Sequence, residues 1–200
     1  MPTRPGAVTA SVVVVGSVNV DLVVRVPSLP VPGETVSGGT FARAFGGKGA
    51  NQAAAAASLG ARVRLVGLTG DDDFGRLARE DLLSRGVDIS TLGTSPSATG
   101  IAAIMVDRSG ENAIAVASGA NHDLTDAFVT EQLERVTESN VVLLANLEVP
   151  DEAVEAAARV VAERGWRFVL DPAPVRPLPP SVLARCDVLT PNEHEADALG

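Results

Sequence analysis

The sequence predicts a doubly wound α/β protein, in which helices cover both faces of a mostly parallel β-sheet. Short runs rich in valine, such as residues 11–16, lack the polar alternation of a half-exposed strand and are typical of strands buried on both faces. Helix-like stretches separate these runs, as the crossovers between parallel strands require. With 200 residues, 46% of them hydrophobic and 20% charged, the chain is long and apolar enough for one large domain.

The expected elements alternate along the chain. Strands are expected at residues 11–16, 63–67, 141–145, 168–171 and 188–190. Helices are expected at residues 49–59, 74–84, 123–137, 151–163 and 180–185. The alternation predicts a single α/β domain over residues 11–200, after a disordered tail of residues 1–10.

Two segments interrupt this alternation and predict a small β-layer at one edge of the domain. Residues 22–45 are extended and rich in proline and glycine, and residues 99–117 have the pattern strand, turn, strand. Such a layer could close over a ligand as a lid or pair with a second copy of itself. The alternative is a pair of surface hairpins without a function.

Composition excludes several classes of function. The 16 basic and 25 acidic residues give a net charge of −9, and aromatic residues make up 3%, so nucleic acid is a poor partner. Cys186 is the single cysteine, which excludes an intrachain disulfide and favours a reducing compartment. Residues 1–10 lack the apolar core of a secretory signal, and the longest apolar runs are too short to cross a membrane. These features predict a cytoplasmic protein.

The segment Phe45-Gly-Gly-Lys-Gly-Ala-Asn-Gln52 predicts a ligand-binding loop at the start of a helix. Its glycines allow backbone N–H groups to approach an oxygen-rich ligand, and Lys48 and Asn51 add further donors. It is not a Walker A loop, because Ala42 and Gly49 stand where glycine and serine or threonine would be required. It is not a dinucleotide fingerprint either, because it does not directly follow the first strand. A plain glycine turn is the alternative.

Polar side chains also follow two expected strands. Asn19 and Asp21 are two residues apart just after the first strand, so both point to the same side and could hold hydroxyl groups. Glu148 ends the run that begins at Val141, at the edge where open α/β sheets bind ligands. A simple turn around Asn19 and a solvated Glu148 are the alternatives.

Asn192 and Glu195 follow the last expected strand. Their spacing is that of a capping box, which favours a helix start that needs no ligand. The alternative places Glu195 near a hydrated Mg²⁺ or a phosphate. His122 and His194 lack the context of a zinc site, and the chain has no Gly-x-Ser-x-Gly elbow of a hydrolase.

Six short segments follow one another along the chain: Gly16-Ser-Val-Asn-Val-Asp21, Pro32-Gly-Glu-Thr35, Phe45-Gly-Gly-Lys-Gly-Ala-Asn-Gln52, Thr69-Gly-Asp-Asp72, Leu147-Glu148, and Thr190-Pro-Asn-Glu193 with Glu195. In this order they resemble the ribokinase branch of the PfkB carbohydrate kinase family. The likeness runs from about Val12 to the end of the chain and implies a ribokinase-like fold with a β lid.

The resemblance implies a role for particular residues. Asn19 and Asp21, with Val20 between them, would hold the sugar hydroxyls, and the loop of Gly47, Lys48, Gly49, Ala50 and Asn51 would wrap the other side of the sugar. Glu148 would be a further sugar-contacting acid, and Ala102 and Ile104 would be apolar lid residues over the ring. Asn192 would contact the nucleotide, and Glu195 would influence Mg²⁺ and phosphate.

The resemblance also implies an activity. Family members transfer the γ-phosphoryl group of ATP to a sugar hydroxymethyl. Because the glycine-rich loop with Asn19 and Asp21 looks most like that of the ribose enzymes, the expected substrate is D-ribose and the expected product is ribose 5-phosphate. The expected cofactors are ATP, Mg²⁺ and, in a full-length member, K⁺. A homodimer through the β lid is expected as well. A fructokinase, a nucleoside kinase and an unrelated Rossmann-like nucleotide binder are the alternatives.

The family's catalytic aspartate lies in a Gly-Ala-Gly-Asp motif, and Gly119-Ala-Asn121 is the nearest string in this sequence. We therefore expect that the catalytic aspartate and the C-terminal part of the fold lie beyond Gly200. The chain would then hold mainly the sugar site and be inactive alone, either as a fragment of a longer enzyme or as a sugar-binding module.

Overall fold

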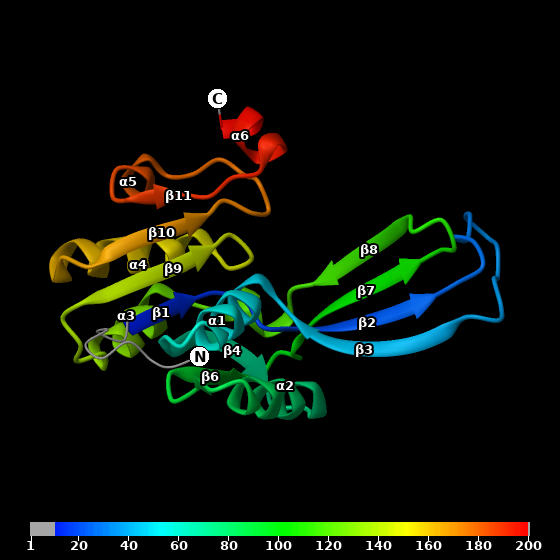
Figure 1. The fold of residues 1–200 in the computed structure, drawn as a ribbon, viewed down its shortest axis with the longest axis horizontal. Helices are drawn as coiled ribbons and strands as arrows, with labels where there is room; N and C mark the ends of the chain where they lie inside the picture. The colour runs from blue at the N-terminus through cyan, green and yellow to red at the C-terminus, as the bar shows by residue number, and fades with distance from the viewer. Residues whose placement is uncertain (1–10, 200) are drawn as a thin grey trace.

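The fold is a parallel sheet between two helical layers, with a second sheet that projects from one edge (Figure 1). The computed structural model describes residues 11–199, so the tail predicted at residues 1–10 lies outside the described residues. Within them, the main sheet has seven strands, and all of its strand pairs are parallel. The predicted fold class is confirmed.

The strand order of the main sheet is β11-β10-β9-β1-β4-β5, and β6 pairs with the second half of β4. The strands are β1 (Ser11–Val15), β4 (Arg62–Gly70), β5 (Val87–Asp88), β6 (Leu92–Ser95), β9 (Val141–Asn146), β10 (Arg167–Asp171) and β11 (Val188–Leu189). Because β1 lies in the interior of the sheet, its valines alternate between two cores. Val13 and Val15 pack in one hydrophobic cluster, and Val14 packs in the other.

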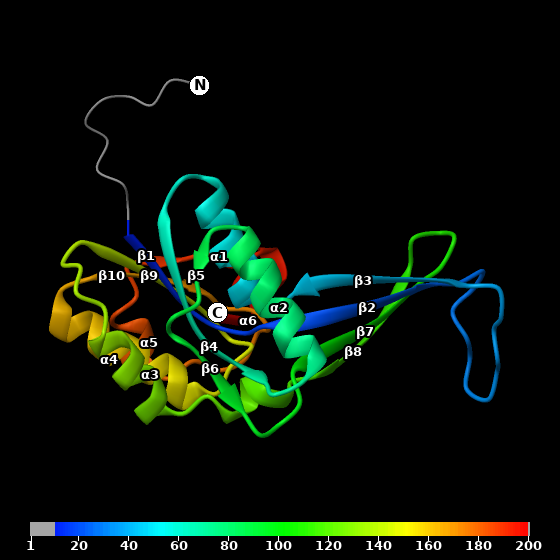
Figure 2. The same ribbon diagram turned by 90° about the horizontal axis from the view of Figure 1, so that it is seen from below.

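The helices cover both faces of this sheet (Figure 2). On one face lie α1 (Lys48–Ser58) and α2 (Asp73–Ser84), and on the other lie α3 (Asp126–Glu134), α4 (Asp151–Arg164) and the short α5 (Pro180–Leu183). Helix α6 (Glu193–Leu199) follows β11 at the carboxyl edge. None of the helices in the described part of the chain is long and apolar enough to span a membrane.

The structure corrects the prediction at two places. The helix expected at residues 123–137 is split into a 3₁₀ turn, Gly119–Asp123, and α3, because Thr125 accepts a hydrogen bond from the Phe128 amide (3.3 Å) and so begins a new helix. Strands β5 and β6 were not predicted. They have two and four residues, and they lack the valine-rich pattern that marks the longer strands.

The projecting sheet consists of β2 (Asn19–Arg25), β3 (Thr40–Gly46), β7 (Gly100–Val106) and β8 (Asn112–Ala117), in the order β3-β2-β7-β8. Strands β2 and β7 are parallel, and the other two pairs are antiparallel. The two interrupting segments of the sequence therefore lie side by side in one sheet, which extends away from the body of the protein (Figures 1 and 2).

Asp72 fixes the point at which β7 leaves the body. Its carboxylate caps α2 by accepting a hydrogen bond from the Gly75 amide (2.7 Å), and it also accepts from the Thr99 amide (2.8 Å) and the Thr99 hydroxyl (2.7 Å). Burial opposes ionisation of this carboxyl, but the hydrogen bonds from Thr99 and Gly75 outweigh it, so the pKa of Asp72 lies below its ordinary value. The base of the projecting sheet is thus tied to the first turn of α2.

Candidate functional site

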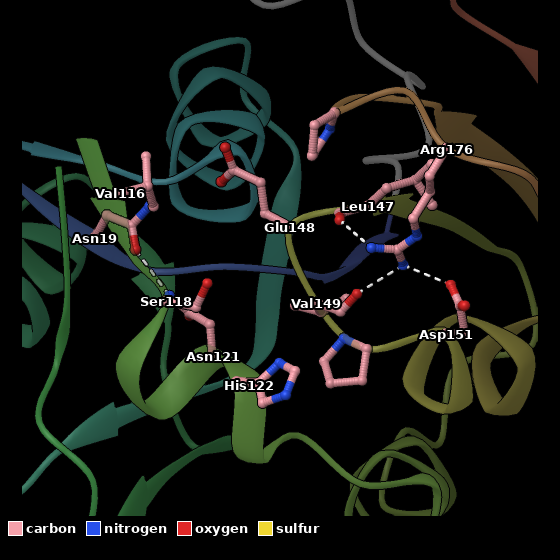
Figure 3. Close-up of a pocket in the computed structure, with 12 residues that line it drawn as sticks. Asn19, Val116, Ser118, Asn121, His122, Leu147, Glu148, Val149, Asp151 and Arg176 are labelled. Atoms are coloured by element: carbon pink, nitrogen blue, oxygen red, sulfur yellow. Dashed lines mark hydrogen bonds and ion pairs between the residues drawn. The ribbon is translucent and has the colours of Figure 1, made fainter. Parts of the chain in front are cut away.

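A cavity of about 550 Å³ opens at the carboxyl edge of the main sheet, beside the projecting sheet (Figure 3). Its wall includes Asn19 at the start of β2, Val116 of β8, Asn121 of the 3₁₀ turn and Glu148 after β9. Open α/β sheets bind ligands at this edge, where the strand connections leave a crevice. Two predicted sugar contacts, Asn19 and Glu148, therefore share one cavity.

The first turn of α1 is pressed against the turn between β1 and β2. A Cβ atom on Gly49 would lie 2.5 Å from the carbonyl carbon of Gly16, and Gly47 has a φ of 89°, which favours glycine. The Ala50 amide donates a hydrogen bond to the Ser17 carbonyl (2.9 Å). The glycines of the predicted loop are needed for this close approach.

The contact between α1 and the β1–β2 turn also positions the side chain of Glu148. Its Oε2 accepts hydrogen bonds from the Ser17 hydroxyl (2.5 Å) and from the Lys48 amide at the start of α1 (2.9 Å). Hydrogen bonds to a carboxylate are among the stronger ones in proteins. Ser17 was not predicted as a site residue. Its place in the segment between Gly16 and Asn19 is the feature of the sequence that could have indicated it.

Asn121 holds the amide of Asn19 in one orientation. The buried Asn121 side chain donates to the Oδ1 atom of Asn19 (2.7 Å) and also bonds the amide (2.8 Å) and carbonyl (3.1 Å) of Val18. Because Oδ1 of Asn19 is occupied as an acceptor, its Nδ2 group is the part that can donate to a ligand. Asn121 was missed because nothing local in the sequence links it to Asn19.

Asp21 lies on the same side of β2 as Asn19, as the spacing predicted, and close to Gly46 of β3. Burial raises the pKa of Asp21, and the charge of Glu148 raises it further. Asp21 is not one of the residues that line the cavity, but its carboxylate interacts with that of Glu148, which does line it. Hydroxyl donors of a ligand would relieve the desolvation and repulsion of these carboxylates.

Other predicted contacts have different surroundings. The Val20 side chain is fully buried in the core that faces α1 and α2, so it is the backbone of Val20 that could meet a ligand. Ala102 lies opposite Asp21 in the pairing of β2 with β7, and Ile104 lies opposite Val23, on the same face. Asn51 is exposed and lines a separate cavity of about 10 Å³ that it shares with Asn19.

A second polar group lies between α1 and the end of β10. The Lys48 ammonium is 3.7 Å from the carboxylate of Asp171, which also accepts a hydrogen bond from the Gln52 side chain (3.2 Å). Burial raises the pKa of Asp171, the charge of Lys48 offsets this in part, and the charge of Glu195 adds to the rise. Asp171 was not predicted, although it ends a strand at the same sheet edge as Glu148.

Asn192 and Glu195 form the capping box that their spacing favours. The two oxygens of Glu195 accept from the Asn192 amide and side chain (2.9 Å each), and the Glu195 amide donates to Asn192 Oδ1 (2.8 Å). Residues 11–199 contain no group of three or more His, Cys, Asp or Glu side chains that could hold a metal ion. Both carboxylate oxygens of Glu195 are engaged in the capping box, and the expected roles of Glu195, Mg²⁺ and K⁺ stay predictions.

Solved structures define the class of protein. The chain superimposes with a TM-score of 0.84 on a ribokinase from Thermotoga maritima (32% identity, 95% of this chain and 62% of that one). It superimposes with a TM-score of 0.82 on the Arabidopsis thaliana ribokinase complexed with ribose and ATP (32% identity, 96% of this chain and 63% of that one). The fold is thus a ribokinase-like α/β fold.

The chain belongs to the pfkB family of carbohydrate kinases, whose family model matches residues 9–199. It is 42% identical to the ribokinase of Haemophilus influenzae over 93% of this chain and 61% of that protein. It is 39% identical to the ribokinase of Bacillus subtilis over 94% of this chain and 64% of that protein. The chain therefore spans less than two thirds of the length of these curated relatives.

Proposed function

We propose that this chain provides the sugar site of an ATP-dependent ribokinase, which converts D-ribose to ribose 5-phosphate. The observation that carries the proposal is that Asn19 and Glu148 line one cavity. Asp21 is close enough for the charge of Glu148 to raise its pKa. The similarity to ribokinases over more than nine tenths of the chain supports ribose as the substrate.

The side chains divide the recognition of the sugar between donors and acceptors. The Nδ2 group of Asn19 donates to a sugar oxygen, because Asn121 occupies its other end. The carboxylates of Asp21 and Glu148 accept hydrogen bonds from sugar hydroxyls. Ala102 of β7 and Val116 of β8 lie on the same face as Asp21 and cover the apolar side of the ring, so that the projecting sheet acts as a lid.

Phosphoryl transfer needs the sugar hydroxymethyl held in line with ATP, and positioning provides much of the rate. When bound, ATP with Mg²⁺ supplies the phosphoryl group. Asn192 contributes a nucleotide contact at the neighbouring end of the sheet, and K⁺ accompanies the activity of the full-length family member. The 200-residue chain binds ribose without transferring phosphate, because its sequence has no Gly-Ala-Gly-Asp motif.

Two copies of the chain pair through the projecting sheet. Ile114 and Val116 are 56% and 59% exposed and lie on the face that carries Asp21, and Ile104 lies beside Ile114 in register. An exposed apolar face of this kind favours association with a second copy.

The test is calorimetric titration of the 200-residue chain with D-ribose, D-fructose and adenosine in parallel. Saturable binding of ribose that exceeds binding of the other two is expected. Preference for fructose or adenosine would move the protein to another branch of the family. A phosphorylation assay with ATP, Mg²⁺ and ribose should give no turnover, and clear turnover would refute the proposal that phosphoryl transfer needs a Gly-Ala-Gly-Asp motif.

A further inference from the structure

Glu148 lies in a connection that has no regular secondary structure. Strand β9 ends at Asn146 and helix α4 begins at Asp151, so residues 147–150 lie outside the hydrogen-bond ladder of the sheet. A short irregular segment needs partners for its backbone groups if it is to hold a side chain in one place. The Leu147 amide donates a hydrogen bond to the Ala173 carbonyl (3.0 Å).

Arg176 provides the partners on both sides of Glu148. From the loop between β10 and α5, its guanidinium donates to the carbonyl oxygens of Leu147 (2.8 Å) and Val149 (2.8 Å) (Figure 3). It also pairs with the carboxylate of Asp151 in the first turn of α4 (2.7 Å). Three residues at alternate positions, 147, 149 and 151, are thus held by one side chain.

This arrangement uses the shape of the guanidinium as well as its charge. A planar fork of N–H donors can span two carbonyls and a carboxylate at once, which the single ammonium of a lysine cannot do in the same geometry. Figure 3 shows the fork in the cavity wall, with Glu148 extending from the same segment toward α1. The Glu148 carboxylate then meets the Ser17 hydroxyl and the Lys48 amide.

We propose that Arg176 is a positioning residue for Glu148 and thereby sets the affinity of the cavity for a sugar. It acts through the backbone of residues 147–149 and not by touching the sugar. The part of the inference that concerns sugar affinity rests on the proposed function, whereas the part that concerns the place of Glu148 does not.

The experiment compares Arg176→Met with a matched control, Arg164→Met, in the 200-residue chain. Arg164 also donates to two backbone carbonyls, those of Val136 (2.8 Å) and Glu134 (3.3 Å), but it lies outside the cavity wall. One readout is the amide proton shift of Lys48 in the ligand-free chain, since this proton is bonded to Glu148. The other is the dissociation constant for D-ribose.

Arg176→Met should move the Lys48 amide signal upfield, the direction also expected for Glu148→Gln, and weaken ribose binding by roughly tenfold, which equals about 1.4 kcal/mol. Arg164→Met should lower the melting temperature but leave both readouts unchanged. If Arg176→Met does not fold, Arg176→Lys retains the charge and should show the same changes to a smaller extent.

Unchanged Lys48 shift and ribose affinity in a folded Arg176 variant would overturn the inference, and so would equal changes in Arg164→Met. If the unsubstituted chain binds no ribose but Arg176→Met moves the Lys48 signal, the proposed function is wrong and the positioning role of Arg176 stands.

Discussion

Replacing Gly49 with alanine tests whether the contact between α1 and the β1–β2 turn builds the site. The added Cβ would lie 2.5 Å from the Gly16 carbonyl carbon and 2.6 Å from the Ser17 amide nitrogen, so the gap must widen by about 0.9 Å to reach an ordinary contact of 3.4 Å. Both atoms belong to the backbone and cannot rotate away. Overpacking of this kind costs about 1–3 kcal/mol, and the higher helix propensity of alanine offsets at most about 1 kcal/mol of it.

The same displacement should weaken ribose binding. Moving the first turn of α1 outward stretches the bond between the Lys48 amide and Glu148, which is 2.9 Å long. Hydrogen bonds to a charged group contribute about 1.5–3 kcal/mol, so the dissociation constant for ribose should rise at least about tenfold.

The assay pairs urea denaturation with calorimetric titration of ribose, and Gly86→Ala is the control. Gly86 has a φ of 80° and no atom within 4 Å of the added Cβ, so its substitution strains the backbone by about 1–2 kcal/mol without crowding the site. Unchanged ribose affinity in folded Gly49→Ala, or an equal loss in Gly86→Ala, would show that the contact between α1 and the β1–β2 turn does not build the site.

Three further predictions concern the neighbouring residues. The pKa of Asp21 is raised, so the contribution of its carboxyl to the stability of the folded state falls as the pH rises from the unfolded pKa, near 4, through the folded pKa. Glu148→Gln removes one cause of the raised pKa, so the titration of Asp21 followed by carbon NMR should move to lower pH. An unmoved titration would contradict the interaction between Asp21 and Glu148. Asp72→Ala should lower the free energy of unfolding, measured by urea denaturation, by about 2 kcal/mol and speed amide exchange at Thr99. Asp73 has a side chain that is 89% exposed, so Asp73→Ala should leave the free energy of unfolding nearly unchanged. The lowered pKa of Asp72 means that its stabilisation is lost as the pH falls below about 4, so equal acid sensitivity of Asp72→Ala and the unsubstituted chain would count against it. Ile114→Lys should convert a dimer to a monomer, measured by light scattering. Leu59 is 88% exposed and lies outside the projecting sheet, so Leu59→Lys should leave the dimer intact. A monomeric unsubstituted chain would contradict the dimer proposal.

The main sheet could be predicted from the sequence because its central strands are valine-rich runs buried on both faces. Val13 and Val14 face different cores, so apolar residues stand at consecutive positions of β1, and the run is recognisable without any knowledge of its neighbours. Strand β6 could not be predicted in this way. Its residues Gly93 and Thr94 carry no such pattern, and the strand is defined by its pairing with β4.

The site was predictable where a residue's position in the sequence fixes its position in the fold. Glu148 ends a buried strand, and the carboxyl ends of parallel strands share one edge of the sheet. Asn121 and Arg176 were not predictable, because they act across long separations in sequence: Asn121 bonds Val18, 103 residues away, and Arg176 bonds Leu147, 29 residues away. Such contacts follow from tertiary packing and leave no local pattern.

The most direct test of the sugar site is calorimetric titration of D-ribose into the 200-residue chain and into its Asp21→Ala variant. We expect saturable binding to the unsubstituted chain, no measurable binding to Asp21→Ala, and full binding to the exposed control Asp73→Ala. Undiminished ribose affinity in Asp21→Ala, or no binding to the unsubstituted chain, would contradict the proposed sugar site.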